Sequence, residues 1–399
     1  MAGNTAAGIN VNEIAELQGV RECLQFFTRE RQWINEIQLQ MCRVPAPTFL
    51  EQERAAWFQE QLRGMGWETG IDRAGNVIAT SGVEPYVAMT AHLDTVLAPR
   101  NKDDVSVGSD GRFHGPGVSD NGAGLAALLA VARVWKNCPK IGRGLMLVAN
   151  VGEEGEGNLL GMRHLCKQAR KIHGFVIVDG ANTDHITTRA LGSRRFEVTF
   201  SGPGGHSWSD FGLGNPVHAL CRAVALFAET RLESGPKSSI NVGLIEGGSG
   251  VNAIAQTARA KVDIRSESND RMDDLVDLLT AAVESARDQE NQRASGPRVT
   301  VKTREIGSRP AAALSEQAPI LQYVRAVDAH LGIRSHLDCS STDANIPLSM
   351  GIPAIAIGAG GVGGGAHTTG EWFSPEGRDL GLKRILLTLL LLMREGNGR

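Results

Sequence analysis

Four continuous apolar runs of strand length constrain the fold of this chain more than any other feature of its sequence. Because the runs do not alternate with polar residues, they predict strands covered on both faces, as in a parallel sheet. Helical patterns separate several of them, for example over residues 121–135, and this alternation is typical of an α/β fold. The four runs occupy residues 86–94, 144–152, 173–180 and 351–360.

The two ends of the chain have helical patterns. Residues 12–42 show helical periodicity, and Thr48 with Glu51 three residues later matches a capping box that would start a further helix. The apolar run at 385–393 is too short for a membrane span, which needs about 20 residues, so it predicts a buried C-terminal helix.

A different pattern begins near residue 190. Residues 194–202 and 257–267 alternate apolar and polar side chains, as half-exposed strands do. Helices are predicted at 215–233 and 271–289, and a further strand at 298–306. The buried runs resume after this stretch, so we expect a small α+β domain inserted into the larger one.

The length of the chain supports more than one domain. At 399 residues it exceeds the ~250–300 residues at which a single core stops growing. The predicted organisation is a catalytic sheet domain in two parts, residues 1–189 and 308–399, with the inserted domain at residues 190–307.

Charge and cysteine content narrow the class of protein. The formal net charge is −3, which gives no reason to expect nucleic acid or a membrane surface as a partner. No basic segment followed by an apolar stretch opens the chain, so no signal peptide is predicted. The six cysteines have no paired spacing and are expected to be reduced thiols. Together these features favour a cytoplasmic protein.

Acidic and imidazole side chains follow the buried runs at the point where each run ends. In open α/β sheets, sites form outside the carboxyl ends of the strands, so these side chains are expected to meet. His92 and Asp94 are two residues apart on an extended segment and point the same way, which would let Asp94 orient the His92 imidazole. The other candidates are Asp120, Glu153, Glu154, Asp179 and His367.

Each of these residues has an ordinary explanation when it is taken alone. An adjacent pair such as Glu153–Glu154 is usually a solvated turn, and Asp120 has the position of a helix N-cap. The glycine-rich tract 358–366 resembles a dinucleotide-binding loop, but no helix follows it directly and no acidic partner lies about 20 residues later. It is their recurrence at successive strand ends that argues for one site.

Two histidines and several carboxylates, without sulfur, form a set of hard and borderline ligands. Such a set suits Zn²⁺, Co²⁺ or Mn²⁺ in an open catalytic site rather than in a closed structural one. A carboxylate that bridges two ions about 3.5–4 Å apart is the arrangement of two-metal hydrolases. The residues therefore indicate a metal-dependent hydrolase.

Six ordered motifs resemble the dinuclear zinc metallopeptidases of the M20 clan, and the likeness covers the whole chain. The clan includes tripeptidases, dipeptidases, carboxypeptidases and deacylases. The segment 340–358, SSTDANIPLSMGIPAIAIG, most resembles its peptidase T-like branch. The resemblance implies an α/β catalytic domain with an inserted ferredoxin-like α+β lid or dimerisation domain. The motifs are TAHLDTV, GPGVSDNGAG, VGEEGEGN, IVDG, SGPGGHSW and AHTTGEW.

The resemblance also implies how the candidates would bind two Zn²⁺ ions per subunit, with Co²⁺ or Mn²⁺ as possible substitutes. His92 and Asp179 would hold one ion, and Glu154 and His367 the other. Asp120 would bridge the two.

Two further acids would act beside these ligands. Asp94 would orient His92, and Glu153 would be the general base that takes a proton from the water between the ions and passes it to the leaving amine. The adjacent glutamates are then explained by a division of roles, because Glu154 would bind metal while Glu153 faces the attacking water.

In the inserted domain, the resemblance implies that His206 donates a hydrogen bond to the oxyanion, in many relatives from the neighbouring subunit of a homodimer. Asn252 resembles a residue that contacts substrate. Arg265 could bind a substrate carboxylate or simply lie on an exposed strand face. Asp343, in the large domain, is predicted near the substrate, as a supporting residue rather than a metal ligand.

The sequence leaves the substrate open. A free α-amine would need an acid, for which Asp343 or Glu371 is available, and a terminal carboxylate would need a cation such as Arg265. We expect amide-bond hydrolysis in small peptides by an exopeptidase, with an aminopeptidase favoured. The alternatives are a carboxypeptidase, an N-acyl-amino-acid deacylase, or a homologue that binds a ligand without turnover.

Overall fold

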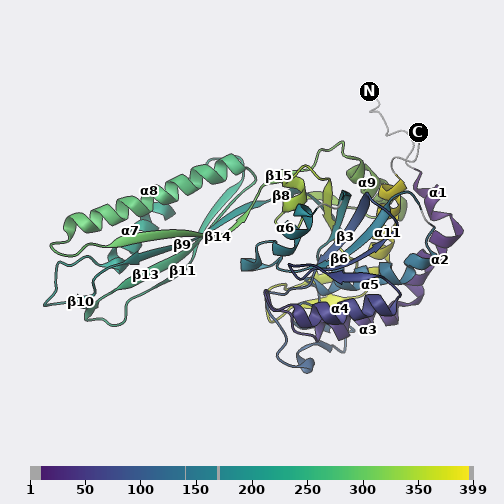
Figure 1. Cartoon of the computed structure of the whole chain (residues 1–399), viewed down its shortest axis with the longest axis horizontal. Helices are drawn as coiled ribbons and strands as arrows, with labels where there is room; N and C mark the ends of the chain where they lie inside the picture. The colour runs from purple at the N-terminus through teal and green to yellow at the C-terminus, as the bar shows by residue number, and fades with distance from the viewer. Residues whose placement is uncertain (1–9, 140, 169–170, 395–399) are drawn as a thin grey trace. The chain divides into compact units, whose positions relative to one another are not determined.

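Two compact units make up the protein. Unit 2 is a single stretch, Leu191–Ala312, and unit 1 is formed by the segments on either side of it, Met1–Ala190 and Ala313–Arg399. The inserted domain is expected from the sequence at residues 190–307, whereas unit 2 ends at 312. The computed structural model describes residues 10–139, 141–168 and 171–394 (Figure 1).

Unit 1 is built on a mixed sheet with the strand order β1–β2–β6–β3–β7–β17–β8–β15, and β16 pairs with β8. The central strands β6, β3, β7 and β17 are parallel, and antiparallel pairs lie on either side of them. The strands are β1 Thr69–Ile71, β2 Val77–Ser81, β3 Tyr86–His92, β6 Gly144–Asn150, β7 Ile172–Val178, β8 His185–Ala190, β15 Ala312–Ala313, β16 His336–Ser340 and β17 Ala354–Ile357. The predicted mostly parallel sheet is confirmed.

The central strands are buried on both faces, as their continuous apolar runs predict. On β3, Val87, Met89 and Ala91 belong to the main core, while Thr90 and His92, which point to the other face, are also buried. α5 and α11 both pack against β3. The helices of unit 1 are α1 Val11–Ala15, α2 Gln18–Arg29, α3 Arg31–Cys42, α4 Gln52–Gly64, α5 Gly122–Val134, α6 Leu160–Lys167, α9 Pro319–Leu331, α10 Asn345–Ser349 and α11 Arg378–Arg394.

The predicted capping box before α4 is wrong. The helix begins at Gln52 with Glu51 as its N-cap residue, and no side chain caps it. The Thr48 hydroxyl instead donates to Asp94 Oδ2 at 2.9 Å. The reason is that residues 47–50 form a turn, closed by the Leu50 N–H bonded to the Pro47 carbonyl at 2.8 Å, so the helix starts too late for Thr48 to be its N-cap.

A small antiparallel sheet lies beside the main one in unit 1, in the order β18–β19–β5–β4. Its strands are β4 Ser106–Val107, β5 Phe113–His114, β18 Val362–Gly364 and β19 Trp372–Ser374. Its pairing of β5 with β19 joins a segment from the first half of the chain to one near residue 372. The pairing therefore fixes the loop between β18 and β19, which carries His367.

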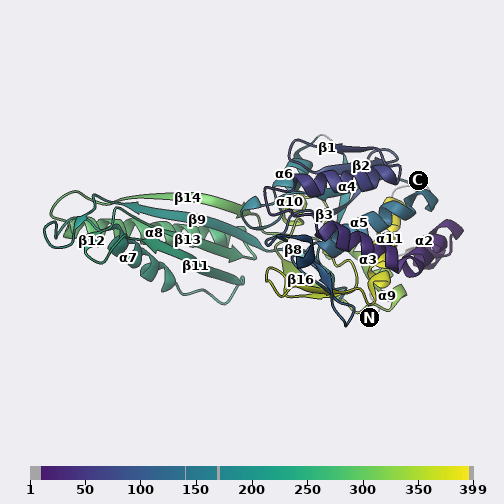
Figure 2. The same ribbon diagram turned by 90° about the horizontal axis from the view of Figure 1, so that it is seen from below.

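Unit 2 has the βαββαβ chain order of a ferredoxin-like fold (Figure 2). Its four-stranded antiparallel sheet has the order β11–β13–β9–β14, and α7 and α8 contact it. The elements are β9 Gly192–Ser201, β10 Gly205–His206, α7 Pro216–Ala228, β11 Ser238–Gly247, β12 Ala253–Ile254, β13 Thr257–Ser266, α8 Asn269–Arg293 and β14 Thr300–Arg309. The sequence did not predict edge strand β11, none of whose residues is buried.

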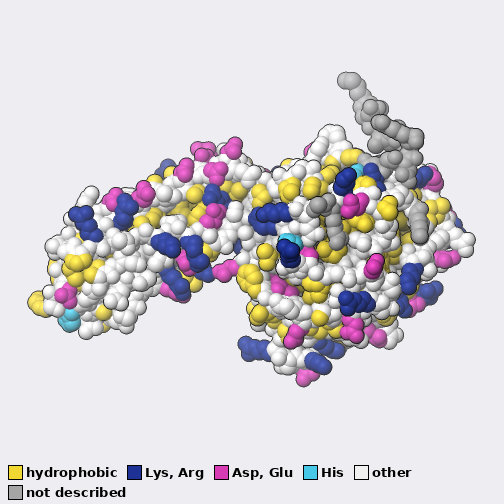
Figure 3. Space-filling view, in the orientation of Figure 1, with side chains coloured by type: hydrophobic (Ala, Val, Ile, Leu, Met, Phe, Trp, Pro, Cys, Tyr) yellow, Lys and Arg dark blue, Asp and Glu magenta, His cyan; other side chains and the backbone are white. Residues whose placement is uncertain are grey.

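The surface carries both signs of charge. On the face drawn in Figure 3, Lys and Arg side chains are interspersed with Asp and Glu. Among the helices that the structure describes, none is both long enough and apolar enough to cross a membrane.

A buried ion pair between α9 and α11 gives a first testable prediction. Arg384 is fully buried, and its Nε and Nη2 lie 2.6 and 2.7 Å from the two carboxylate oxygens of Asp328. Arg384→Ala would leave the Asp328 carboxylate buried without its partner. We expect the free energy of unfolding to fall by about 3–5 kcal/mol in urea titrations.

The exposed pair Arg394–Glu13 is the matched control for this experiment. Arg394→Ala should change the free energy of unfolding by less than about 1 kcal/mol. The double variant Arg384→Met/Asp328→Leu should recover most of the loss, because it removes both charges. Equal losses in the single and double variants would contradict the explanation.

Candidate active site

Most of the predicted site residues meet at one edge of the unit 1 sheet. β6, β3 and β7 are parallel neighbours, so their carboxyl ends lie side by side. One residue ends β3, two follow β6, one follows β7, and two come from the loops before α5 and between β18 and β19. These residues are His92, Glu153, Glu154, Asp179, Asp120 and His367.

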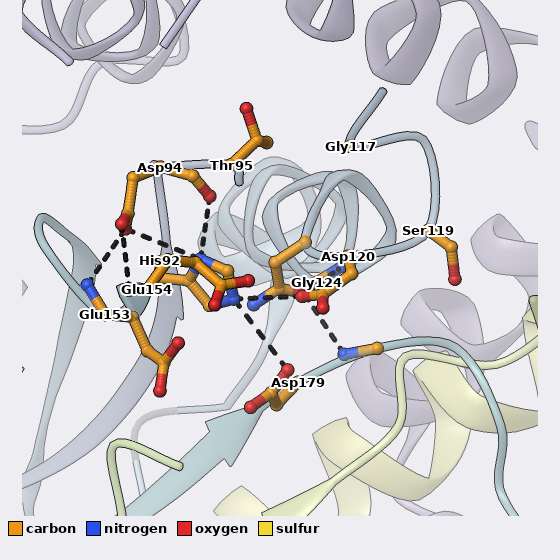
Figure 4. Close-up of polar contacts among 12 residues, drawn as sticks. His92, Asp94, Thr95, Gly117, Ser119, Asp120, Gly124, Glu153, Glu154 and Asp179 are labelled. Atoms are coloured by element: carbon orange, nitrogen blue, oxygen red, sulfur yellow. Dashed lines mark hydrogen bonds and ion pairs between the residues drawn. The ribbon is translucent and has the colours of Figure 1, made fainter. Parts of the chain in front are cut away.

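His92 is almost fully buried within this group. Its Nδ1 donates to the backbone carbonyl of Asp94 at 2.9 Å, because a carbonyl oxygen can only accept. This contact leaves Nε2 for the carboxylates, 3.1 Å from Asp120 Oδ1 and 3.8 Å from Asp179 Oδ1 (Figure 4). A histidine held through one nitrogen, with the other facing acids, has the arrangement of a metal ligand.

His367 reaches the same acids from a loop far away in the sequence. Its Nε2 lies 2.7 Å from Glu154 Oε1 and 3.1 Å from Asp120 Oδ2. Asp120 therefore contacts both imidazoles, His92 through one carboxylate oxygen and His367 through the other. Ligand atoms of His92, Asp120 and Glu154 all lie within 4.8 Å of one another.

The charges in this group shift one another's protonation. Burial lowers the pKa of His92, but its contacts with Asp120 and two other aspartates outweigh burial and raise that pKa well above 6.5. Contacts with Asp120 and Glu154 raise the pKa of His367 to about 10. Burial opposes ionisation of Asp120, yet the two imidazoles hold its pKa well below the usual range. With no other cation bound, these contacts favour the protonated form of both imidazoles.

Asp94 makes different contacts from those predicted. Its carboxylate is 3.6 Å from His92 Nδ1, so the Asp94 backbone carbonyl orients the imidazole more closely than the side chain does. The carboxylate instead accepts the backbone N–H groups of Glu153 at 3.0 Å and Glu154 at 2.9 Å (Figure 4). It also accepts the Thr48 hydroxyl. Asp94 thus fixes the loop that carries the adjacent glutamates.

Glu371 holds the loop of Asp120 in the same manner. Its carboxylate accepts the backbone N–H groups of Gly117, Ser119 and Asp120 at 2.8, 2.8 and 2.9 Å. The side chain is 4% exposed and its hydrogen bonds lie within the protein. These contacts assign the Glu371 carboxylate to the Asp120 loop and weaken the suggestion that it binds a substrate amine.

Asn121, rather than Asp120, caps helix α5, and the sequence reasoning missed it. The Asn121 Oδ1 accepts the N–H of Gly124 at 3.1 Å, and its Nδ2 donates to the Val178 carbonyl at 2.8 Å. This side chain ties the Asp120 loop to the end of β7, directly before Asp179. The signal that could have found it is asparagine, a strong N-cap residue, immediately before the helix.

Glu51, the N-cap residue of α4, and Arg54, on the first turn of that helix, also support the site, although nothing in the sequence indicates this role. Glu51 accepts the N–H of Gly152, directly before Glu153, at 3.0 Å. Arg54 is fully buried and donates to the carbonyls of Val44 and Leu93 at 2.9 and 2.8 Å. Burial lowers the pKa of Arg54 while nearby acids oppose that shift.

Asp343 is buried rather than open to a substrate. It is 1% exposed, and its Oδ2 accepts a hydrogen bond from Asn150 at 2.7 Å. Asn150 is the strand partner of His92 in the pairing of β3 with β6. Burial raises the pKa of Asp343 to about 7. Its burial and its contact with Asn150 suit the predicted supporting role behind His92 better than contact with a substrate amine.

Three predicted site residues lie in unit 2, in two separate places. His206 and Asn252 are neighbours, since the Ser207 N–H donates to the Asn252 carbonyl and β10 pairs with β12. Arg265 is on β13, whose first residue is Thr257. It lies eight residues beyond Thr257 and therefore about 27 Å from the start of the strand. Its Nε donates to Asp263 Oδ2 at 2.7 Å. Within unit 2, Arg265 therefore does not share a site with His206.

The unit 1 group fits a bound cation. Its donors are imidazole nitrogens and carboxylate oxygens, a set that suits Zn²⁺, Co²⁺ or Mn²⁺. The carboxylates raise the pKa of both imidazoles because negative charge is in excess among them. A metal ion would supply the charge that two protons supply otherwise.

The sequence of this chain is similar to those of known proteins. The sequence profile of peptidase family M20/M25/M40 matches residues 88–390, more than half of the chain. The chain belongs to this family. The M20 assignment made from the motifs is therefore confirmed.

Two curated relatives match parts of the chain. A succinyl-diaminopimelate desuccinylase of Psychrobacter sp. strain PRwf-1 is 26% identical over 211 residues, 48% of this chain and 52% of that protein. The cytosol non-specific dipeptidase of Escherichia coli strain K12 is 27% identical over 280 residues, 60% of this chain and 55% of that protein. The chain thus spans about half the length of these two relatives.

The fold also matches solved structures. A tripeptidase from Staphylococcus aureus has a TM-score of 0.75 at 20% identity, and the match covers 92% of this chain and 99% of that one. At this identity the likeness shows the fold, a mostly parallel sheet domain with an inserted α+β unit.

The raised pKa values of the two imidazoles give a prediction about metal uptake. A metal ligand must be neutral imidazole, so binding at pH 7 has to displace the protons of His92 and His367. We expect release of about two protons when Zn²⁺ saturates the protein, and an apparent affinity that increases with pH. Calorimetry in buffers of different ionisation enthalpy measures the number released.

The His367→Ala variant tests the assignment, and His218→Ala, an exposed histidine of unit 2, is its control. The first should release about one proton fewer, whereas the second should match the wild type. Zn²⁺ binding without proton release would contradict the placement of these histidines at the metal.

Proposed function

We propose that this protein is a metal-dependent exopeptidase that hydrolyses an amide bond in small peptides. The observation that carries the proposal is the contact of Asp120 with both His92 and His367, beside a loop that presents Glu153 and Glu154 together. In this proposal Asp120 would bridge two ions, a pair of ligands would lie on either side of it, and an additional acid would act on water, as two-metal hydrolysis requires.

The proposed ligands divide into two sets around Asp120. His92 and Asp179 would hold one Zn²⁺ ion, and Glu154 and His367 the other. Co²⁺ and Mn²⁺ suit the same donors. When bound, the ions would lower the pKa of water towards ~7 and polarise the scissile carbonyl.

Glu153 is the proposed general base. It takes a proton from the attacking water and gives it to the amine that leaves. Its position supports this role, because Asp94 and Glu51 hold the backbone on both sides of it through the N–H groups of Glu153, Glu154 and Gly152. A base held in this way loses little freedom when it reacts.

His206 is the proposed donor to the oxyanion. The backbone N–H of Trp208 donates to His206 Nδ1 at 3.2 Å, so the proton of the neutral imidazole is on Nε2. The exposed ring therefore offers an N–H donor to another molecule. Asn252, its neighbour, is the proposed substrate contact of the same segment.

The proposal also covers the substrate, the oligomeric state and the location of the protein. We propose a small peptide as substrate, with an N-acyl amino acid as the alternative, and a homodimer formed through unit 2. We also propose a cytoplasmic location. Arg265 is engaged by Asp263, which weakens the alternative that a cation in unit 2 binds a terminal carboxylate.

Glu153→Gln tests the general base. It keeps the shape of the side chain but removes the proton acceptor, so kcat should fall by ~10²–10⁴ while the metal content is unchanged. Glu156→Gln, an exposed position in the same loop, is the control and should retain activity. Unaltered turnover by Glu153→Gln would remove the assigned role.

The substrate screen for this experiment consists of di- and tripeptides with free or blocked termini and N-acyl amino acids, each with added Zn²⁺, Co²⁺ or Mn²⁺. A requirement for a free amine supports an aminopeptidase. Hydrolysis of amine-blocked substrates supports a carboxypeptidase or deacylase. No turnover by the metal-loaded protein would favour the ligand-binding alternative.

His206→Ala tests the oxyanion donor. We expect kcat to fall by ~10²–10³ without loss of metal, because only a contact made in the transition state is removed. His218→Ala serves again as the exposed-histidine control. Loss of metal from the His206 variant would instead make this residue a ligand.

A further inference from the structure

Backbone strain is concentrated in the segments around the proposed site. Non-glycine residues with positive φ are uncommon, and strained residues gather at functional sites in proteins. In the described part of the chain, the non-glycine residues with positive φ all belong to loops that bear or contact the site residues. They are Phe49 (φ 76°), Asn158 (53°), Leu159 (61°) and His367 (64°).

Phe49 is the member of this group whose side chain has no evident use in the protein. His367 is a proposed ligand, and Asn158 and Leu159 join the Glu154 loop to α6, with Leu159 fully buried. Phe49 is 53% exposed. A bulky residue is poorly suited to a left-handed backbone. Because neither the backbone nor burial favours phenylalanine here, we infer that its ring contacts another molecule.

The turn that carries Phe49 is fixed to the site on both sides. It spans Pro47 to Leu50, closed by a hydrogen bond from the Leu50 N–H to the Pro47 carbonyl at 2.8 Å. Within it, Thr48 donates to Asp94, and directly after it Glu51 accepts the N–H of Gly152. The turn therefore lies against the loop of the proposed general base, and its position is set by the same hydrogen bonds.

Other exposed apolar side chains lie on the same segment as Phe49 and on the segment next to it. Leu50 is 63% exposed, and Val96 and Leu97 are 44% and 36% exposed. The two segments are neighbours, because the Thr95 N–H donates to the Ala46 carbonyl at 3.0 Å and Pro47 pairs with Thr95. We call the four side chains Phe49, Leu50, Val96 and Leu97 the apolar rim.

We propose that the apolar rim binds an apolar side chain of the substrate next to the scissile bond, with Phe49 as a specificity-determining residue. The inference rests on the proposed peptidase function and adds the substrate class. Its basis is continuity with the site, since the rim lies on the two segments that flank Asp94. An apolar side chain would gain by leaving water for this surface, whereas a polar or charged one would lose hydration.

The test compares wild type, Phe49→Ala and Phe49→Gly on metal-loaded protein. The substrates are tripeptides that carry leucine or serine at one position and are otherwise identical, with each position varied in turn. At the position next to the rim, wild type should prefer leucine. Both variants should lose ~10- to 100-fold in kcat/KM for the leucine peptide and less than ~3-fold for the serine peptide.

Two measurements separate this role from a structural one. The melting temperature of Phe49→Gly should equal or exceed that of wild type, because glycine adopts positive φ without strain. Val83 is a 72% exposed apolar residue that precedes the first residue of β3, at the end of the strand away from His92. Val83→Ala should leave both kcat/KM values unchanged. A lower melting temperature for Phe49→Gly would show that the ring packs within the protein and would overturn the inference.

The remaining outcomes also decide the question. If wild type is active and the Phe49 variants keep the same ratio of kcat/KM for leucine and serine peptides, the substrate-binding role of the apolar rim is wrong. The proposed peptidase function would still stand. An equal loss for every peptide would mean that Phe49 aids closure rather than specificity, and would overturn the rim as well. A metal-loaded wild type that hydrolyses no peptide would overturn both the function and the rim.

Discussion

The concentration of negative charge at the ends of three parallel strands is the constraint on which the rest of unit 1 depends. Carboxylates held this close in a partly buried setting repel one another more strongly than at a free surface. The chain offsets the repulsion with protonated His92 and His367, with the buried guanidinium of Arg54 and with backbone N–H groups. As the proposed ligands, the two imidazoles would exchange their protons for a metal ion, whereas Arg54 cannot give up its charge. The positive charge on the imidazoles would therefore be replaced by that of the metal ion, and the charge of the carboxylates would stay compensated.

A second layer of acids holds the first in position. Asp94, Glu371 and Glu51 have side chains that could bind a metal ion, yet each accepts one or more backbone N–H groups of the loops that carry the proposed ligands. These loops lie outside regular secondary structure, so their N–H groups need acceptors that no sheet or helix supplies. Buried carboxylates meet that need with strong, charge-assisted hydrogen bonds. The cost of burying them is offset because they fix several atoms of the site at once.

Much of this organisation could be predicted from the sequence, and for a physical reason. Strands buried on both faces leave continuous apolar runs, and an acidic or imidazole side chain at the end of such a run, such as that of Asp179 or His92, stands out in the sequence. Contacts between distant segments leave no such mark. Thr48 and Glu51 have the spacing of a capping box, and the hydrogen bonds to Asp94 and Gly152 that they make instead depend on tertiary structure. Strand β11 escaped prediction because none of its residues is buried.

The interrupted path of the chain through unit 1 bears on the order of events during synthesis. β17 lies between β7 and β8 in the sheet, although it follows unit 2 in the sequence. His367 and Glu371 emerge later still. On the ribosome, the ferredoxin-like insert is complete while the surrounding sheet still lacks an inner strand, and domains that are complete tend to fold first. A nascent chain thus lacks His367, a proposed ligand, until unit 2 and β17 have both been translated, so the proposed site is assembled only after the inserted domain is complete.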